Sequence, residues 1–357
     1  MISTPIRGVA AAQDDLTNAT NVCIIGGSGF IGTRLTRDLC VRGHRVRIAD
    51  IVAPKAVGDG LDIDYSQADV RDVASLVPAM AGCGTVVNLA AVHRDDVRPR
   101  RLYDEVNVEG ARNVCRAAEA NGIGTIVFTS SVAVYGTAPE NADETQPHCP
   151  CNDYGRTKSE AERVYTDWYV QDSGARRLVI VRPTVVFGPG NRGNVHTLVS
   201  QVAAGRFLMV GDGKNRKSMA YVDNVSGFIS HLLPGQPGIH IYNYVDKPDL
   251  SMNELVAIVR ASLGMNSRVS LKIPYWLAIA IGYGCDAVAL ATRRTLPISQ
   301  IRIEKFCTNT VFSAERALTQ TEFVPQVPLH IGLRKMIAAD FGRRSEIARL
   351  IGIDLSR

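Results

Sequence analysis

The chain has 357 residues, of which 46% are hydrophobic and 21% charged, a composition typical of a globular protein with a sizeable core. Its formal net charge of +5 comes without a block of lysine and arginine or interleaved aromatic residues, which argues against nucleic acid as a partner. The eight cysteines are scattered, and His148-Cys149-Pro150-Cys151 lacks a second ligand pair at a zinc spacing, so we expect no metal site.

The N-terminal segment is polar and aperiodic. It lacks the cationic start and apolar core of a signal peptide, so we predict a flexible arm over residues 1–20. This expectation, together with the scattered cysteines, favours a cytoplasmic protein.

An apolar strand at 21–25 leads directly into a glycine-rich turn and a helix. The turn reads Gly26-Gly27-Ser28-Gly29-Phe30-Ile31-Gly32. Gly26 permits a sharp turn, Gly29 lets the backbone approach phosphates, and Gly32 lets the helix pack closely on the strand. A second strand at 44–50 ends in Asp50, whose carboxylate can accept hydrogen bonds from an adenosine ribose. This order of elements predicts a dinucleotide-binding site.

The alternation of strands and helices continues as far as Pro183. Further strands are expected at 61–69, 85–91, 125–131 and 177–183, and helices at 73–81, 102–121 and 154–172. The pattern predicts an α/β fold, a Rossmann-type doubly wound parallel sheet with a smaller C-terminal substrate-binding lobe. We assign residues 21–183 to the dinucleotide-binding core and 184–357 mainly to the lobe, interwoven with the core.

A tyrosine and a lysine lie four residues apart, at Tyr154 and Lys158, and therefore share one face of the predicted helix. The ammonium of the lysine stabilises a phenolate and lowers the pKa of the tyrosine from about 10. Such a tyrosine can exchange a proton with a carbinol or carbonyl while hydride moves to or from a nicotinamide. Ser131, at the end of a predicted parallel strand, is placed to hydrogen-bond the reacting oxygen.

The most apolar segment of the chain, at 273–291, is interrupted by Asp286 and by glycine and proline residues. It is marginal for spanning a bilayer. We interpret it as a buried or surface-docking helix and do not expect contact with a membrane.

These motifs together resemble the extended short-chain dehydrogenases/reductases, within the NAD-dependent epimerase/dehydratase family that acts on nucleotide sugars. The resemblance covers roughly residues 20 to 330. Besides the glycine turn, Ser131, Tyr154 and Lys158, it rests on Asp69-Val70, Asn88-Leu89-Ala90-Ala91, Asn107-Val108-Glu109-Gly110 with Asn113, and the segment from Lys217 to Asn224.

The resemblance implies roles for individual residues. Gly26, Gly29, Phe30 and Ile31 would line the pyrophosphate, and Asp50 would hold the adenosine ribose. Asp69 and Val70 would contact the adenine, Ala90 and Ala91 the centre of the cofactor, and Lys158 the nicotinamide ribose. Ser131, Tyr154 and Lys158 would be the catalytic residues, with Asn107 a structural or proton-relay residue beside them.

Two positions narrow the reaction that the resemblance implies. Val132-Ala133 stand where the family's 4,6-dehydratases carry an acidic pair, so water elimination is not expected. Val185 stands where galactose-type 4-epimerases commonly carry an asparagine that binds the substrate. The segment from Arg182 to Gly190 is closer to 4-keto-sugar reductases and surface-polysaccharide enzymes.

We therefore predict an NAD-dependent nucleotide-sugar epimerase that removes hydride from C4 of a UDP-type sugar and returns it. The alternatives are an NAD(P)H-dependent 4-keto-6-deoxy nucleotide-sugar reductase of surface-polysaccharide biosynthesis and, in another class, a non-catalytic dinucleotide-binding sensor or scaffold. Such non-catalytic proteins typically lose the tyrosine or lysine, and both are present here.

The remaining expectations concern the ligands and the assembly. Arg216, Lys217 and Arg192 are candidates to bind the diphosphate of the substrate. Asp50 would repel a 2′-phosphate and favours NAD over NADP, although Arg34 and Arg47 are near enough in sequence to weaken that argument. The resemblance also suggests a homodimer formed through the helices at 102–121 and 154–172.

Overall fold

The computed structural model describes residues 20–55, 61, 63–94, 96–266, 272–292 and 300–350. The N-terminal arm predicted over residues 1–20 therefore lies outside the described residues, except for Thr20.

A seven-stranded sheet forms the centre of the first lobe, in the order β10-β6-β5-β4-β1-β2-β3, and every neighbouring pair of strands is parallel. Its strands are β1 (Asn21–Ile25), β2 (Arg45–Asp50), β3 (Ile63–Gln67), β4 (Thr85–Asn88), β5 (Thr125–Thr129), β6 (Arg177–Pro183) and β10 (Gly238–Tyr244). The chain runs outward from β1 in one direction and then from β4 in the other, so the order of strands reverses between β1 and β4. The predicted doubly wound α/β fold is confirmed.

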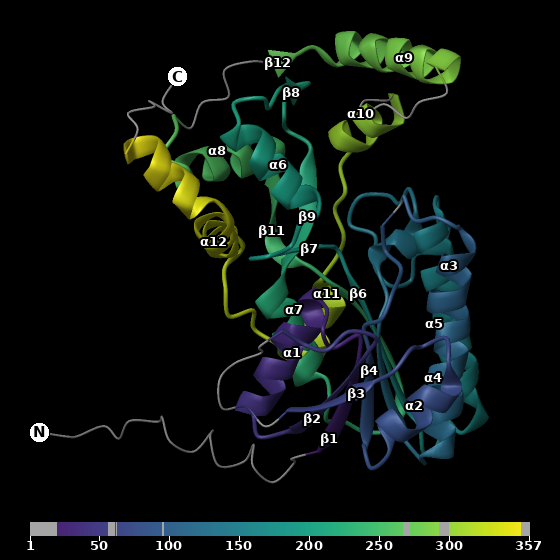
Figure 1. Cartoon of the computed structure of the whole chain (residues 1–357). Coiled ribbons are helices and arrows are strands. Elements are labelled where there is room, and N and C mark those ends of the chain that lie inside the picture. Colours follow the sequence, from purple (N-terminus) through teal and green to yellow (C-terminus); the bar gives the residue numbers. More distant parts are fainter. Residues whose placement is uncertain are drawn as a thin grey trace, which may run out of the picture.

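Helices cover both faces of this sheet (Figure 1). One face carries α2 (Val73–Met80), α4 (Gly110–Ala120) and α5 (Asp153–Gln171), and the other carries α1 (Phe30–Val41), α7 (Val222–His231) and α11 (Glu315–Thr321). Because the strands are buried on both faces, their runs of valine, isoleucine and leucine supply two apolar cores, one on each side of the sheet.

The helix predicted at 102–121 is present but is not regular. It begins as α3 (Arg101–Tyr103), passes through a π-helical segment at Asp104–Glu109 and continues as α4. A π-helical turn inside an α-helix frequently marks a functional site, because it changes which residues face the core. Here the segment contains Asn107, which is buried.

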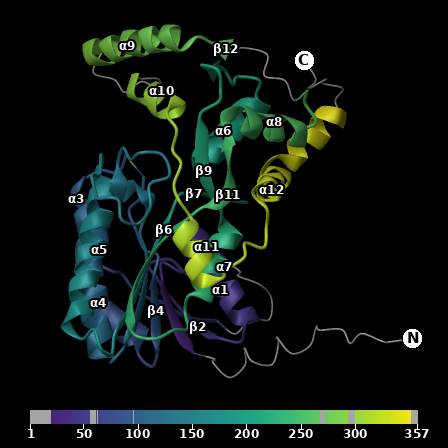
Figure 2. The same cartoon turned by 180° about the vertical axis from the view of Figure 1, so that it is seen from behind.

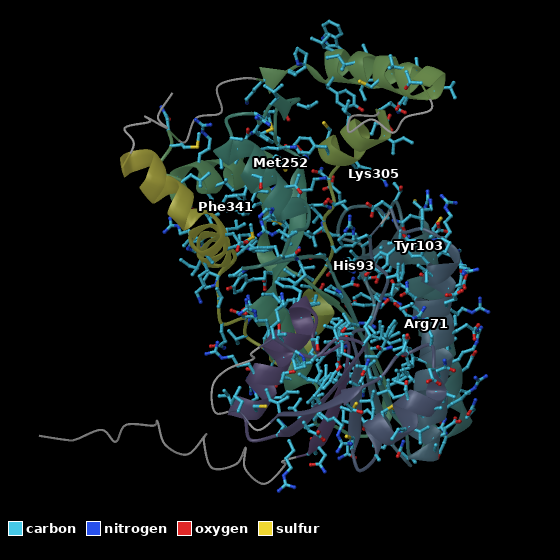
Figure 3. The ribbon with its side chains drawn as sticks, in the orientation of Figure 1. Arg71, His93, Tyr103, Met252, Lys305 and Phe341 are labelled. Carbon is cyan, nitrogen blue, oxygen red and sulfur yellow. The ribbon has the colours of Figure 1, made fainter. Side chains whose placement is uncertain are left out.

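A second lobe is built mainly after Pro183. It contains a sheet of β7 (Val185–Phe187), β9 (Arg216–Tyr221) and β11 (Asp246–Ser251), and the strand pair β8 (Met209–Val210) and β12 (Lys272–Ile273). Its helices are α6 (Asn194–Ala203), α8 (Met252–Ser262), α9 (Tyr275–Thr292), α10 (Gln300–Cys307) and α12 (Leu329–Leu350). Met252 and Phe341, labelled in Figure 3, both belong to the apolar core of this lobe.

The two lobes are interwoven along the chain, because α7 and β10 return to the first lobe between segments of the second. Helices α9 and α10 lie at the far end of the second lobe, beyond β12, in both views of the molecule (Figure 2). Among the described residues, no helix combines the length and the hydropathy needed to cross a membrane.

Candidate active site

The glycine-rich turn after β1 lies directly against the end of β4. Gly26 has a φ of +77°, and a Cβ at this position would lie 2.7 Å from the backbone nitrogen of Ala90. A Cβ on Gly32 would lie 2.6 Å from the carbonyl oxygen of Gly26, so α1 begins in close contact with the turn. The loop thus occupies the point where the strand order reverses, the usual site of a dinucleotide in such sheets.

The first turn of α1 presents backbone N–H groups at this loop. Gly29 is the N-terminal cap of α1, and no side chain caps the helix there. The unpaired donors and the positive end of the helix dipole favour a bound phosphate. The turn leaves a space beside the helix N-terminus that a side chain at Gly26 or Gly32 would fill. This space fits the pyrophosphate of a dinucleotide.

Asp50 follows at the end of β2, beside the glycine turn. Its carboxylate accepts hydrogen bonds from the backbone N–H groups of Ser28 (3.0 Å) and Val52 (3.1 Å). The two arginines near it in sequence have other partners. Arg47 donates to Asp64 at 2.5 Å, and Arg34 lies 3.8 Å from the carboxylate of Asp223. Both arginines thus interact with acids other than Asp50. They no longer weaken the argument that Asp50 repels a 2′-phosphate and favours NAD.

The predicted adenine residues lie just beyond the end of β3. Arg71 donates to Asp69 at 2.6 Å, and this hydrogen bond lowers the pKa of the Asp69 carboxyl. Val70 is buried, and its carbonyl accepts a hydrogen bond from Asn113 at 2.9 Å. The predicted cofactor residues therefore gather at the carboxyl edge formed by β1 to β4, where Ala90 and Ala91 also lie.

Ser131 and Tyr154 lie on two segments that meet beyond the end of β5. Ser131 begins a 3₁₀ turn after β5, and its Oγ accepts a hydrogen bond from the backbone of Ala133 at 3.2 Å. Helix α5, capped by Asn152, begins against this turn: a side chain at Gly155 would overlap the carbonyl oxygen of Ala133. The glycine next to Tyr154 thus lets the first turn of α5 approach the segment of Ser131.

Lys158 lies one turn further along α5 and is buried, with 2% of its surface exposed. Its Nζ donates to the carbonyl oxygen of Thr129 at 2.7 Å and lies 4.5 Å from the centre of the Phe128 ring. Burial lowers the pKa of Lys158 to about 7, whereas the nearby carboxylate of Glu162 acts in the opposite direction. Lys158 is thus fixed at the end of β5, one helical turn after Tyr154 on α5.

A buried polar network, not predicted from the sequence, lies behind Lys158. Arg182 donates to both oxygens of Glu162, at 2.9 and 2.5 Å, and to the hydroxyl of Tyr135 at 2.7 Å. Ser130 also donates to Glu162, and the Tyr135 hydroxyl donates to Asn243 at 2.7 Å. Glu162 follows Lys158 by four residues and therefore lies on the same face of α5. This spacing was the one signal in the sequence that could have indicated a carboxylate near Lys158.

Asn107, in the π-helical segment, connects the end of β4 to α5. Its amide exchanges two hydrogen bonds with the backbone of Val92, at 2.8 and 3.0 Å, and donates to the hydroxyl of Thr157 at 2.9 Å. Together these contacts fix the turn of α5 between Tyr154 and Lys158 relative to the sheet.

His148 also contacts the buried network. One ring nitrogen lies 2.8 Å from Arg182 and the other 2.8 Å from Ser159. Among the residues that the structure describes, no group of three potential metal ligands is found.

The predicted diphosphate-binding residues lie in the second lobe and are not brought together. Arg216 and Lys217 are consecutive on β9, so their side chains leave opposite faces of the strand. Arg216 donates to the carbonyl of Asp249 at 3.0 Å, and Lys217 donates to the carbonyls of Lys305 (2.9 Å) and Thr308 (2.6 Å). Arg192, before α6, contacts His196 at 2.7 Å.

Lys217 is the more enclosed of the two cations on β9. Desolvation by burial lowers its pKa to about 8. A cavity of about 350 Å³ lies beside its partner Thr308, lined also by Asn215, Tyr275 and Glu304. This cavity joins the predicted diphosphate region to the start of α9 and contains none of the predicted catalytic residues.

The family of the chain is decided by its similarity to known proteins. Residues 22–243 match the model of the NAD dependent epimerase/dehydratase family. The chain belongs to this family. It is 45% identical over 323 residues, 90% of its own length and 95% of the relative's, to the N-acetyl-alpha-D-glucosaminyl-diphospho-ditrans,octacis-undecaprenol 4-epimerase of Escherichia coli O157:H7.

Solved structures agree in fold. MoeE5 in complex with UDP-glucuronic acid and NAD has a TM-score of 0.72 at 22% identity, covering 91% of this chain and 99% of its own. The UDP-N-acetylglucosamine 4-epimerase of Methanobrevibacter ruminantium M1, in complex with UDP-N-acetylmuramic acid, has a TM-score of 0.71 at 20% identity, covering 91% and 99%.

These findings confirm the predicted fold, family, enzyme class and NAD cofactor of this epimerase/dehydratase family member. They also confirm the choice of an epimerase over a non-catalytic dinucleotide-binding scaffold. The roles of the individual site residues stay predictions.

Proposed function

We propose that this enzyme inverts C4 of an N-acetylhexosamine that is joined through a diphosphate to a polyprenol carrier. The observation that carries the proposal is the 45% identity, over nearly the whole of both chains, to a 4-epimerase whose name specifies such a substrate. The nucleotide-sugar enzymes of known structure are about 20% identical and support the fold alone. A diphosphate next to the sugar is common to both carriers, so the site chemistry predicted for a UDP-sugar applies to either.

Tyr154 is the proposed acid–base. Its phenolate accepts the proton of the C4 hydroxyl as C4 becomes a carbonyl, and the phenol returns a proton to that oxygen after the keto sugar has turned over in the site. When bound, NAD would supply reversible hydride transfer at C4, which permits inversion of the configuration there. Ser131 donates a hydrogen bond to the same oxygen, since it lies on the segment that α5 contacts at Gly155.

Lys158 is proposed to lower the pKa of Tyr154 and to bind the nicotinamide ribose. Support comes from its fixed position: its ammonium donates to Thr129 at 2.7 Å and is excluded from water. A buried ammonium acts over a short distance with little screening, so its charge favours the phenolate of the neighbouring tyrosine.

The cofactor is proposed to lie along the carboxyl edge of the sheet, on Gly26, Gly29, Phe30, Ile31, Asp50, Asp69, Val70, Ala90 and Ala91. On the substrate side, we propose Lys217 as the principal cation for the diphosphate. Its ammonium donates to carbonyl oxygens rather than to a carboxylate of the described residues, so its charge is not neutralised there. Arg216 lies on the other face of β9, and Arg192 is exposed beside α6.

We also propose that the enzyme is a cytoplasmic homodimer formed through α4 and α5. These two helices cover one face of the sheet, and Val170 near the end of α5 exposes 66% of its surface. Light scattering of the purified protein measures the mass, and the substitution Val170→Asp is expected to shift it from two chains to one.

The test of the proposed function is a comparison of carriers. Purified enzyme is incubated with N-acetylglucosamine linked to undecaprenyl diphosphate, with the same sugar on a short isoprenyl diphosphate and with UDP-N-acetylglucosamine, and the released sugars are separated. We expect N-acetylgalactosamine from both isoprenyl substrates at a kcat/KM at least about tenfold above that of the UDP-sugar. Faster turnover of the UDP-sugar contradicts the proposed carrier. Consumption of NAD(P)H with a 4-keto sugar, without epimerisation, would instead establish the reductase.

A further inference from the structure

Helix α9 has an apolar face that nothing in the described chain covers. Trp276, Tyr283 and Leu290 expose 70%, 60% and 82% of their surface. They are spaced by seven residues and therefore form one stripe along the helix. Monomeric proteins rarely expose contiguous large apolar side chains, and where they do, the surface usually binds something.

The opposite side of α9 is packed closely on α10, so the exposed stripe has a fixed orientation. A Cβ on Gly282 would lie 2.9 Å from the backbone of Gln300, and Ala278, one helical turn before Gly282, is buried. Asp286, the one acid within α9, accepts a hydrogen bond from the backbone N–H of Gln300 at 3.0 Å. The acid is thus turned toward α10, and the outward face remains apolar.

The sequence that contains α9 has a net positive charge. Residues 272–305 contain five lysines and arginines and two acids. Both acids are engaged by the same residue, because the Gln300 side chain also donates to Glu304. Lys272, at the start of the segment, and Lys305 on α10 (Figure 3) are both exposed. Trp and Tyr on an apolar face with lysines beside it are typical of a helix that lies in the interface of a membrane.

We propose that α9 docks on the surface of an anionic phospholipid bilayer, with Trp276, Tyr283 and Leu290 inserted at the headgroup boundary. The helix lies parallel to the surface rather than across it. This inference rests on the proposed function for its purpose, since a polyprenol carrier stays in the bilayer. It departs from our sequence-based expectation that the chain does not contact a membrane.

The position of α9 relative to the second lobe explains how docking would serve the substrate. The cavity of about 350 Å³ is lined by Tyr275, the first residue of α9, and by Thr308, whose carbonyl binds Lys217. In both views α9 lies at the outer end of the lobe that bears this cavity (Figures 1 and 2). A bilayer against α9 therefore faces the end of the lobe where we propose that the diphosphate binds.

The test is sedimentation of the full chain with vesicles. Wild-type enzyme is expected to sediment with vesicles of phosphatidylethanolamine and phosphatidylglycerol and to sediment less with phosphatidylcholine alone. The triple variant Trp276→Ser/Tyr283→Ser/Leu290→Ser should lose on the order of 100-fold in partition coefficient, because three apolar side chains no longer leave water. The matched control is Val41→Ser/Leu318→Ser/Val324→Ser, which removes three exposed aliphatic side chains from other surfaces and should bind as wild type does.

Activity separates this inference from the proposed function. The triple variant should turn over the short isoprenyl substrate as wild type does and be slower on the undecaprenyl substrate in vesicles. Absence of wild-type sedimentation overturns the docking, even if the short substrate is epimerised. Sedimentation without turnover of either isoprenyl substrate supports the docking and overturns the proposed carrier. A third outcome is that wild type does not sediment with vesicles and that the triple variant has a lower mass by light scattering. This outcome would mean that the face binds a second copy of the chain, and it overturns the docking.

Discussion

The site beside α5 and the outer face of α9 depart in opposite ways from the usual distribution of side chains. Beside α5, the charged groups of Lys158, Glu162 and Arg182 are buried, with 2 to 3% of each residue exposed. On α9, Trp276 and Leu290 are exposed instead. Large exposed apolar groups and fully buried charges are each uncommon. The two regions therefore meet different surroundings: the charged side chains beside α5 are enclosed away from water, whereas the apolar side chains on the outer face of α9 are in contact with it.

The buried charges and the exposed apolar side chains also differ in their effect on the free energy of folding. A buried charge is tolerated only where hydrogen bonds and opposite charges replace water, and the partners of Glu162 and Arg182 all come from this chain. An exposed apolar stripe costs the folded state little by itself, since it was in water before folding as well. Its favourable energy is released only when another surface covers it.

Removal of the phenolic hydroxyl at Tyr154 should give the largest effect on the buried side of the comparison. We expect Tyr154→Phe to lower kcat by about 10³- to 10⁴-fold, because the phenol is the group that we propose exchanges the C4 proton. The fold should persist, as only one oxygen is removed from a half-buried side chain. The control Tyr283→Phe removes the same atom from α9 and should keep wild-type kcat. Retention of more than a tenth of the activity in Tyr154→Phe would remove Tyr154 from the mechanism.

Breaking the buried ion pair should come next. Arg182→Met leaves the carboxylate of Glu162 buried without its strongest partner, and we expect a loss of about 3–5 kcal/mol in the free energy of unfolding. Urea denaturation measures it. The control is Glu160→Gln, which removes one partner of Arg156 at a half-buried surface pair and should cost less than about 1 kcal/mol. Equal losses in the two variants would mean that the network contributes no more than a surface pair.

The first lobe was largely predictable from the sequence because its signals are local. A strand, a glycine turn and a helix require residues that follow one another, and strands β1 to β6 were each expected within a few residues of their observed bounds. The Tyr154–Lys158 pair was predictable for the same reason. Arg182 was not, because its partners Glu162 and Tyr135 come from other elements, and only the folded sheet brings them to the end of β6.

The second lobe was less predictable for two physical reasons. The apolar segment containing Trp276 has the composition of a buried helix, and its exposure depends on what lies outside the chain rather than on the segment. The cations Arg216 and Lys217 are adjacent, and strand geometry sends them to opposite faces of β9. Their carbonyl partners, at Asp249 and Lys305, are distant in sequence. The sequence therefore suggested one diphosphate-binding cluster, whereas the two side chains lie in separate environments.

Lys158 should give a smaller effect that depends on pH. The folded, cofactor-free protein holds its pKa at about 7, below the ordinary value of 10.5. Below pH 7 the folded state bears the full cost of the buried charge, and the cost falls as the pH rises from 7 toward 10.5. The stability of Lys158→Met relative to wild type should therefore be greatest at pH 6 and decline by pH 9.5, as measured by urea denaturation.

The control for this titration is Lys214→Met, which removes an ammonium from the surface. A stability difference between Lys158→Met and wild type that is the same at pH 6 and pH 9.5 would contradict the burial of a titrating ammonium. The hydrogen bond to Thr129 is lost at every pH, so it shifts the whole curve and does not alter its slope.

The smallest effect is expected on the exposed side. Replacing Trp276 by serine in water should change the free energy of unfolding by less than about 0.5 kcal/mol, since the side chain is in contact with solvent in both states. The same change at Trp168, which is 2% exposed, should cost about 3–5 kcal/mol. The two tryptophan-to-serine substitutions make the same chemical change, so the difference between their effects reports only the surroundings of each ring. If Trp276→Ser also destabilises by several kcal/mol, its ring is part of the folded core, and α9 then has no apolar face left to offer a bilayer.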